Sequence, residues 1–121
     1  MAVSDSFREY VLEQLGRVIP IKARRMFGGV GLYGRGLFFA VIDDDVLYFK
    51  VDETTRPDFE AQGMQPFRPF GPDGGALRYF AVPGDVLDDV DRLTVWVGKA
   101  LAVARTARTS KSRGRRRTRR R

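Results

Sequence analysis

The residues with the clearest chemistry are the arginines and lysines near the end of the chain. Residues 105–121, the basic tail, contain ten of them and no Asp or Glu. They are Arg105, Arg108, Lys111, Arg113, Arg115, Arg116, Arg117, Arg119, Arg120 and Arg121. Cations at this density neutralise backbone phosphates and release counterions, and they need no particular bases. The basic tail is therefore predicted to bind DNA or RNA nonspecifically.

Two other interpretations of the basic tail stay open. One is attachment to an anionic membrane surface, and the other is a solvated extension without a function. The tail has no aromatic residue, leucine or lipidation signal that would enter a bilayer, which argues against the membrane. We therefore expect nucleic acid as its partner, and no membrane.

The sequence lacks the residue types on which many enzyme sites depend. It contains no His and no Cys, so imidazole bases, thiol nucleophiles and zinc-thiolate sites are excluded. Several aspartates remain, but Asp85, Asp88, Asp89 and Asp91 are well placed to cap helices. We expect no enzymatic activity, no catalytic residue, no cofactor and no functional metal.

Two short motifs imitate ligand sites. Gly29, Gly31 and Gly34 have the spacing of a dinucleotide fingerprint, but that mechanism requires a helix directly after the glycines. A strand-like run follows here, so we interpret them as turn glycines. The run 43–45 consists of three aspartates that could suggest a cation site. Strand-like runs on both sides favour a hairpin turn instead.

A secondary basic rim is predicted in the middle of the chain. Lys22 and Arg24 alternate along one predicted strand and should share a sheet face, with Arg25 on the other face. Lys50, on a neighbouring strand, could join them. A solvated strand face is the default interpretation, and the functional one is a surface that binds phosphate or an acidic protein.

Aromatic residues accompany this rim. They are Phe38, Phe39, Tyr48, Phe49, Phe67, Phe70, Tyr79 and Phe80. A small domain needs aromatic volume to fill its core, so we expect core packing for them. The alternative is that their rings stack on the bases of single-stranded nucleic acid.

Charge divides the chain into two parts. Residues 1–104 carry 15 acids against 12 bases, a net charge of −3, whereas the basic tail carries +10. The tail cannot bury enough apolar surface to offset the entropy lost on ordering, and its charges repel one another. The sequence therefore predicts a folded domain over 1–104 and a disordered Arg-rich tail over 105–121.

The folded part reads as a mixture of helices and short strands. A helix is expected before Pro20, with a capping box formed by Ser6 and Glu9. Runs rich in aromatic and branched residues predict strands over 23–27, 30–33, 37–42, 46–51 and 76–82. Further helices are expected over 52–62, over 83–87, and from Asp89 or Asp91 to Ala104. This order predicts an α+β fold, with a central antiparallel sheet and helices packed against it.

Several stretches, taken as a set, resemble the N-terminal domain of the TfoX/Sxy family of bacterial competence regulators. The most specific are 24–33 (RRMFGGVGLY) and 47–50 (LYFK), and 36–40, 45–52, 57–59, Tyr79 and Pro83 also match. The resemblance covers about residues 6–104. It implies a compact α+β domain and a role linked to transcriptional control of DNA uptake. Full-length regulators of this family carry a second, helical domain, where this chain has the basic tail.

The sequence thus leads to one expected function and one alternative. We expect a non-enzymatic TfoX-like regulatory domain whose cationic tail binds DNA or RNA without base specificity. The alternative is an adaptor that docks a transcription-related protein through the folded domain. No apolar run approaches the length of a membrane span and no signal peptide is recognisable, so a cytoplasmic location is expected, with nucleoid association if the ligand is DNA.

Overall fold

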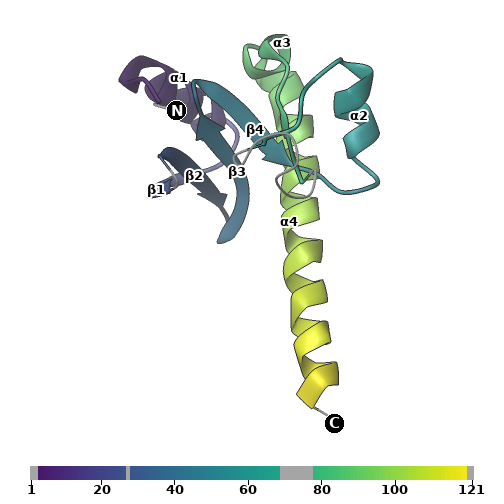
Figure 1. Cartoon of the computed structure of the whole chain (residues 1–121). Helices are drawn as coiled ribbons and strands as arrows, with labels where there is room; N and C mark the ends of the chain where they lie inside the picture. The colour runs from purple at the N-terminus through teal and green to yellow at the C-terminus, as the bar shows by residue number, and fades with distance from the viewer. Residues whose placement is uncertain (1–2, 27, 69–77, 120–121) are drawn as a thin grey trace.

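The computed structural model describes the backbone of residues 3–26, 28–68 and 78–119, and side chains as far as residue 107. These residues form an α+β fold, which confirms the predicted class (Figure 1). The elements are α1 (Asp5–Gly16), β1 (Lys22–Met26), β2 (Gly29–Gly34), β3 (Leu37–Asp43), β4 (Val46–Lys50), α2 (Arg56–Ala61), β5 (Tyr79–Ala81), α3 (Gly84–Leu87) and α4 (Val90–Arg119). Parts of two predicted strands, at Phe27 and 76–77, lie outside the described residues.

The described strands form one antiparallel sheet in the order β1-β2-β3-β4-β5. Two of its hairpins close through two-residue turns in which both residues have positive φ. Arg35 (φ 54°) and Gly36 (φ 76°) join β2 to β3, and Asp44 (φ 51°) and Asp45 (φ 57°) join β3 to β4. Turns of this hand match the twist of the flanking strands. The predicted hairpin at the three aspartates is therefore confirmed.

The N-cap of helix α1 lies two residues before the predicted capping box. The N-cap is Ser4, whose hydroxyl oxygen accepts a hydrogen bond from the amide of Phe7 at 3.2 Å. The amide of Ser4 in turn donates to the carboxylate of Asp45 at 2.7 Å. This bond holds the chain extended at Ser4, so Ser6 already lies inside the first turn. The prediction that Ser6 caps the helix is wrong for that reason.

Helices α1 and α4 pack on the same face of the sheet, which we call the core face. Val11 and Leu15 of α1 and Leu93 and Val97 of α4 are buried in one cluster with the sheet residues. The sheet contributes buried residues to this cluster, including Leu32, Phe39, Ile42, Leu47, Phe49 and Phe80. A register shift between β2 and β3 lets Phe39 and Ala40, which are adjacent in β3, both enter it. Phe59 of α2 joins it and meets the ring of Trp96 edge-on, at a centroid distance of 4.6 Å.

Helix α4 continues past its predicted end at Ala104. Its backbone is helical through Arg119, and Figure 1 shows its C-terminal half running away from the sheet. The predicted end is wrong because Ala and Arg, which dominate residues 100–108, favour helix and no proline interrupts them. The disorder of the tail in the free protein stays a prediction, since like charges spaced three and four residues apart oppose helix.

Candidate nucleic-acid interface

The sheet has a second face, opposite the helices, which we call the outer face. Strand pairing sets Lys22 opposite Tyr33 and Tyr33 opposite Phe38, so these three side chains emerge on the same side. Arg24 lies two residues beyond Lys22 and shares that side. The predicted pairing of Lys22 with Arg24 on one face is thereby confirmed, and Arg25, set opposite the buried Val30, lies on the other.

Five aromatic rings form a continuous row on the outer face. Tyr33 stacks on Phe38 at 5.1 Å between centroids, and Phe38 lies 6.0 Å from Tyr79. Tyr79 meets Phe67 edge-on at 6.4 Å, and Phe67 lies 4.8 Å from Tyr48. All five rings are half-buried. The outer face is therefore neither a solvated polar surface nor part of the main core.

Core packing was predicted for all eight aromatics of this region, and the structure separates them. Phe39, Phe49 and Phe80 are fully buried on the core face, as expected. Phe38, Tyr48, Phe67 and Tyr79 belong to the outer row instead, so the core assignment is wrong for these four. Adjacent aromatics in one strand point to opposite faces, so they cannot all enter one core. Phe70 lies outside the described residues.

A hollow of about 350 Å³ lies at one corner of the outer face, beside β1 and the β2–β3 turn. Its lining consists of Pro20, Ile21, Lys22, Arg24, Tyr33, Arg35 and Gly36. We call it the cationic corner, because three of these residues are cations and none is an acid. Within the described part of the chain, no ion pair to Lys22, Arg24 or Arg35 is found.

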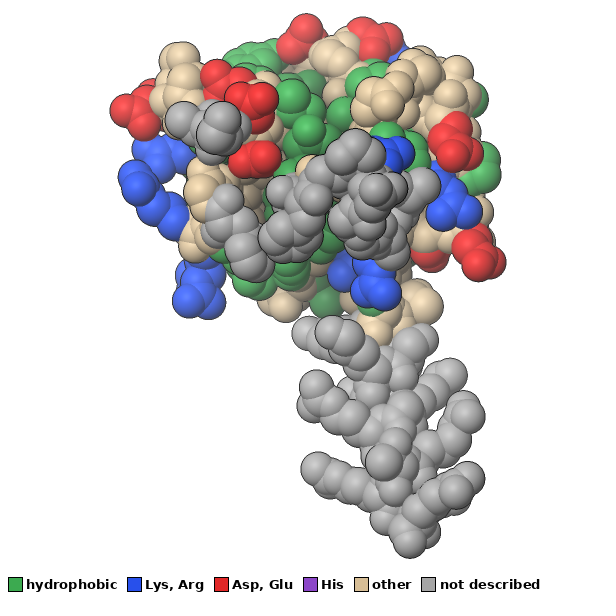
Figure 2. Space-filling model, in the orientation of Figure 1, with side chains coloured by type: hydrophobic (Ala, Val, Ile, Leu, Met, Phe, Trp, Pro, Cys, Tyr) green, Lys and Arg blue, Asp and Glu red, His purple; other side chains and the backbone are tan. Residues whose placement is uncertain are grey.

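Figure 2 shows how charged side chains are distributed on the visible surface. Lys and Arg side chains gather at its left edge, in the region where Figure 1 places β1. Acidic side chains lie above them, toward the side of α1, and others lie along the top and the right of the view. A polyanion that approaches this edge meets its attractive charges at β1.

Lys50 lies on the outer face but not in the cationic corner. Its Nζ lies 5.7 Å from the ring centroid of Tyr79, within the range of a cation–π contact. Burial raises the pKa of Tyr79 to about 12, so its hydroxyl stays neutral at physiological pH. Lys50 also borders a different hollow of about 490 Å³, which includes Asp52 and Glu53. The predicted rim is thus divided between two hollows, and only Lys22 and Arg24 share one.

The outer face is acidic at its opposite end. Burial of the ring, with a further contribution from Asp43 and Asp44 near the β3–β4 turn, raises the pKa of Tyr48. Asp45 belongs to the same turn and is engaged by the amide of Ser4. An anionic ligand is therefore attracted to the β1 end of the face and repelled from the β3–β4 turn.

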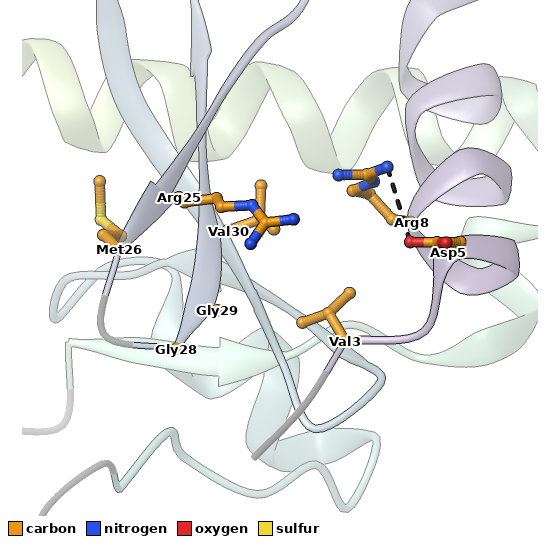
Figure 3. A pocket seen from close by; sticks show the side chains of 8 residues that line it. All are labelled: Val3, Asp5, Arg8, Arg25, Met26, Gly28, Gly29 and Val30. Carbon is orange, nitrogen blue, oxygen red and sulfur yellow. Dashed lines mark ion pairs between the residues drawn. The ribbon is translucent and has the colours of Figure 1, made fainter.

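A further hollow of about 480 Å³ opens on the core-face side of β1. Figure 3 shows Arg25 of β1 pointing toward Arg8 of α1, whose guanidinium lies 3.7 Å from the carboxylate of Asp5. The Nε atom of Arg8 is buried and has no hydrogen-bond partner among the described residues. This hollow mixes two cations with one acid and lies on the opposite side of β1 from the cationic corner.

The glycines of the fingerprint spacing all lie within β2, and a hairpin to β3 follows them. Their assignment to turns is therefore wrong. A Cβ at Gly29 would clash with the carbonyl oxygen of Ile42, and one at Gly34 would lie 2.5 Å from Cδ1 of Ile19. These glycines allow close approach of neighbouring chain segments, which is a structural role.

Two members of the cationic corner were missed by the sequence reasoning. Tyr33 was seen only as part of a strand, and Arg35 only as part of a turn. Both could have been found from the register of the two hairpins, which brings Tyr33 opposite Lys22. An Arg at positive φ costs about 1–2 kcal/mol relative to its right-handed conformation, whereas Gly adopts either freely. An Arg at this turn in spite of the strain therefore indicates a role for its side chain.

The predicted basic tail lies at the end of α4. Arg105 is exposed, and the side chains from Arg108 to Arg121 lie outside the described residues. Asp89 caps the other end of α4 by accepting hydrogen bonds from the amides of Asp91 (3.0 Å) and Arg92 (3.3 Å). Asp85 forms an ion pair with Arg92 at 2.7 Å. The predicted capping role is confirmed for Asp89. Asp85 pairs with Arg92 instead, and Asp88 accepts a hydrogen bond from the hydroxyl of Tyr10.

A known protein family matches the folded part of the chain. The sequence model of the family described as TfoX N-terminal domain matches residues 13–104. This match spans the sheet, α2, α3, the last turn of α1 and the first half of α4, and the chain belongs to the TfoX N-terminal domain family. No curated protein sequence gives a significant match to the chain. Among the described residues, no helix is long and apolar enough to cross a membrane.

Proposed function

We propose that this protein is a non-enzymatic regulatory domain that binds DNA or RNA without base specificity through its basic tail. The observation that carries the proposal is the division of charge. Seventeen residues carry +10, while the preceding 104 carry −3. A cationic segment with no acid of its own binds the phosphate backbone of any sequence, because the attraction depends on charge and not on base edges.

The geometry of α4 supports this assignment. The helix runs past the sheet, so its C-terminal turns extend away from the rest of the domain (Figure 1). Membership in the TfoX N-terminal domain family supports a regulatory role, in keeping with the competence regulators that the sequence resembles. With DNA as the ligand, the protein acts at the nucleoid in the cytoplasm.

Binding by the full chain and by a chain ending at Thr106 tests the proposal. Both are titrated against two scrambled duplexes of equal length. The full chain should bind both duplexes with similar affinity, since no recognition helix or ribbon is assigned to base reading. The shortened chain, with its acidic excess, should bind weakly. Near-full affinity of the shortened chain, or a strong preference for one duplex, would contradict tail-driven binding.

Pull-down from cells, with and without nuclease, separates this function from the adaptor alternative. Loss of every partner after nuclease treatment is the expected outcome. A protein partner that resists nuclease would replace the proposal with docking through the folded domain.

A further inference from the structure

We propose that the cationic corner binds single-stranded nucleic acid, with one base on the ring of Tyr33 and the adjoining phosphates on Lys22, Arg24 and Arg35. The proposal rests on the proposed function for its ligand class, nucleic acid. It adds a second site, in the folded domain, that distinguishes single strands from duplexes.

The first step of the argument is the composition of the hollow. Its volume of about 350 Å³ falls within the usual range for small-ligand sites, about 300–1,000 Å³. Lys22, Arg24 and Arg35 converge on it from a strand and a turn, and none of them is paired with an acid among the described residues. A group of cations that lacks an internal partner attracts an anion from solution.

The second step is the aromatic ring. Tyr33 borders the hollow on one side and is backed by Phe38 on another, with their ring planes inclined by 27°. Phe38 is held in turn by Tyr79. A ring immobilised in this way offers a stacking surface without a large loss of side-chain entropy. The occupant is therefore anionic and planar at once, which describes a nucleotide better than an acidic peptide.

The third step concerns strandedness. Bases in a duplex are stacked on one another and present only their edges, so they cannot lie on Tyr33. Bases in a single strand can leave the stack and pack on an aromatic ring, whatever their identity. The corner therefore favours single strands, whereas the tail attracts both forms. Because both sites belong to one chain, a strand held by the tail meets the corner at a raised effective concentration.

The test uses the full chain and two fluorescent probes, an oligothymidylate of about 15 nucleotides and a duplex of equal length. Tyr33→Leu should weaken binding of the single strand about tenfold and leave duplex binding within twofold. Tyr33→Phe, which keeps the ring, should restore single-strand affinity. An unchanged affinity in Tyr33→Leu, or an equal loss for both probes, would overturn the inference.

A second variant guards against a folding defect at Tyr33. Lys22→Gln combined with Arg24→Gln changes two exposed side chains. For the single strand, it should make the slope of log affinity against log salt shallower by about 1.4. An unchanged salt dependence would contradict phosphate contacts in the corner.

Substituting Gln for Arg115, Arg116, Arg117 and Arg119 in the full chain separates the two proposals. Single-strand binding that still depends on Tyr33, with no effect of the tail changes, would support the corner and refute the tail. Binding that depends on the tail and not on Tyr33 would support the tail and refute the corner. A full chain that binds neither probe would refute both.

Discussion

The phenol ring of Tyr33 stacks on the ring of Phe38 across the β2–β3 pair, with centroids 5.1 Å apart. This contact begins the aromatic row of the outer face and supports the stacking surface of the cationic corner. Phe38→Leu should lower the free energy of unfolding by about 1 kcal/mol beyond the lost buried area. Urea unfolding measures the stability change. A variant as stable as the parent would show that the ring pair contributes nothing to the fold.

Gly29 of β2 should be intolerant of any side chain. In Gly29→Ala the new methyl group meets the backbone oxygen of Ile42, which cannot move without distorting β3. We expect a loss of at least about 2 kcal/mol, as for other overpacked sites. Gly98→Ala is the matched control, because nothing lies within 4 Å of a Cβ at this helical position. It should stabilise α4 by about 0.5–1 kcal/mol. Thermal melts of both variants test the pair, and equal effects would contradict the close packing at Gly29.

Gln14 is a buried polar residue that ties α1 to α3. Its side-chain amide donates a hydrogen bond to the carbonyl oxygen of Leu87 at 2.9 Å. Gln14→Met keeps the volume but removes the donor, and it should cost about 1–3 kcal/mol by leaving that carbonyl unsatisfied. Glu13→Met, at the exposed neighbouring position, should cost less than about 0.5 kcal/mol. Chemical denaturation measures the change in the free energy of unfolding for both variants. No change in Gln14→Met would contradict a stabilising hydrogen bond between α1 and α3.

Tyr79 should make stability fall at high pH. Its pKa is raised from 10.0 to about 12 by burial, so the unfolded chain loses this proton first as pH rises. The contribution is complete below pH 10 and is lost as pH rises through about 12. Tyrosinate absorbance should show one late titration that Tyr79→Phe removes. If Tyr79→Phe leaves the late part of the absorbance curve intact, the burial of this hydroxyl is misassigned.

The body should fold without the basic tail. The buried residues of α4 end at Ala104, and the cluster that packs the sheet needs nothing beyond it among the described side chains. A chain ending at Thr106 should keep a cooperative thermal transition close to that of the full chain. A broad or absent transition would show that the tail belongs to the fold.

Sequence reasoning succeeded where a single local pattern decided the outcome. Alternating aromatic and branched runs gave the strands, and paired turn residues such as Asp44 and Asp45 gave a hairpin. It failed where two segments had to be aligned. The division of Phe38 from Phe39 between opposite faces depends on which face the helices cover, and one strand alone does not contain that information.

The candidate site shows the same limit. Lys22 and Arg24 were found from alternation along one strand, whereas Tyr33 and Arg35 joined them only through the register of two hairpins. Lys50 was grouped with them because its strand is nearby, but β2 and β3 separate it from β1. Ser4 capped α1 in place of Ser6 because Asp45, distant in sequence, holds its amide. Long-range partners of this kind are absent from local sequence patterns.

The salt dependence of duplex binding tests the central claim most directly. Neutralising about 5–8 phosphates should give the full chain a slope of log affinity against log salt of roughly −4 to −7. Changing Arg115, Arg116, Arg117 and Arg119 to Gln should make the slope shallower by about 3–4, whereas changing the same four to Lys should preserve it. An unchanged slope in the Gln variant would show that the basic tail does not carry the binding.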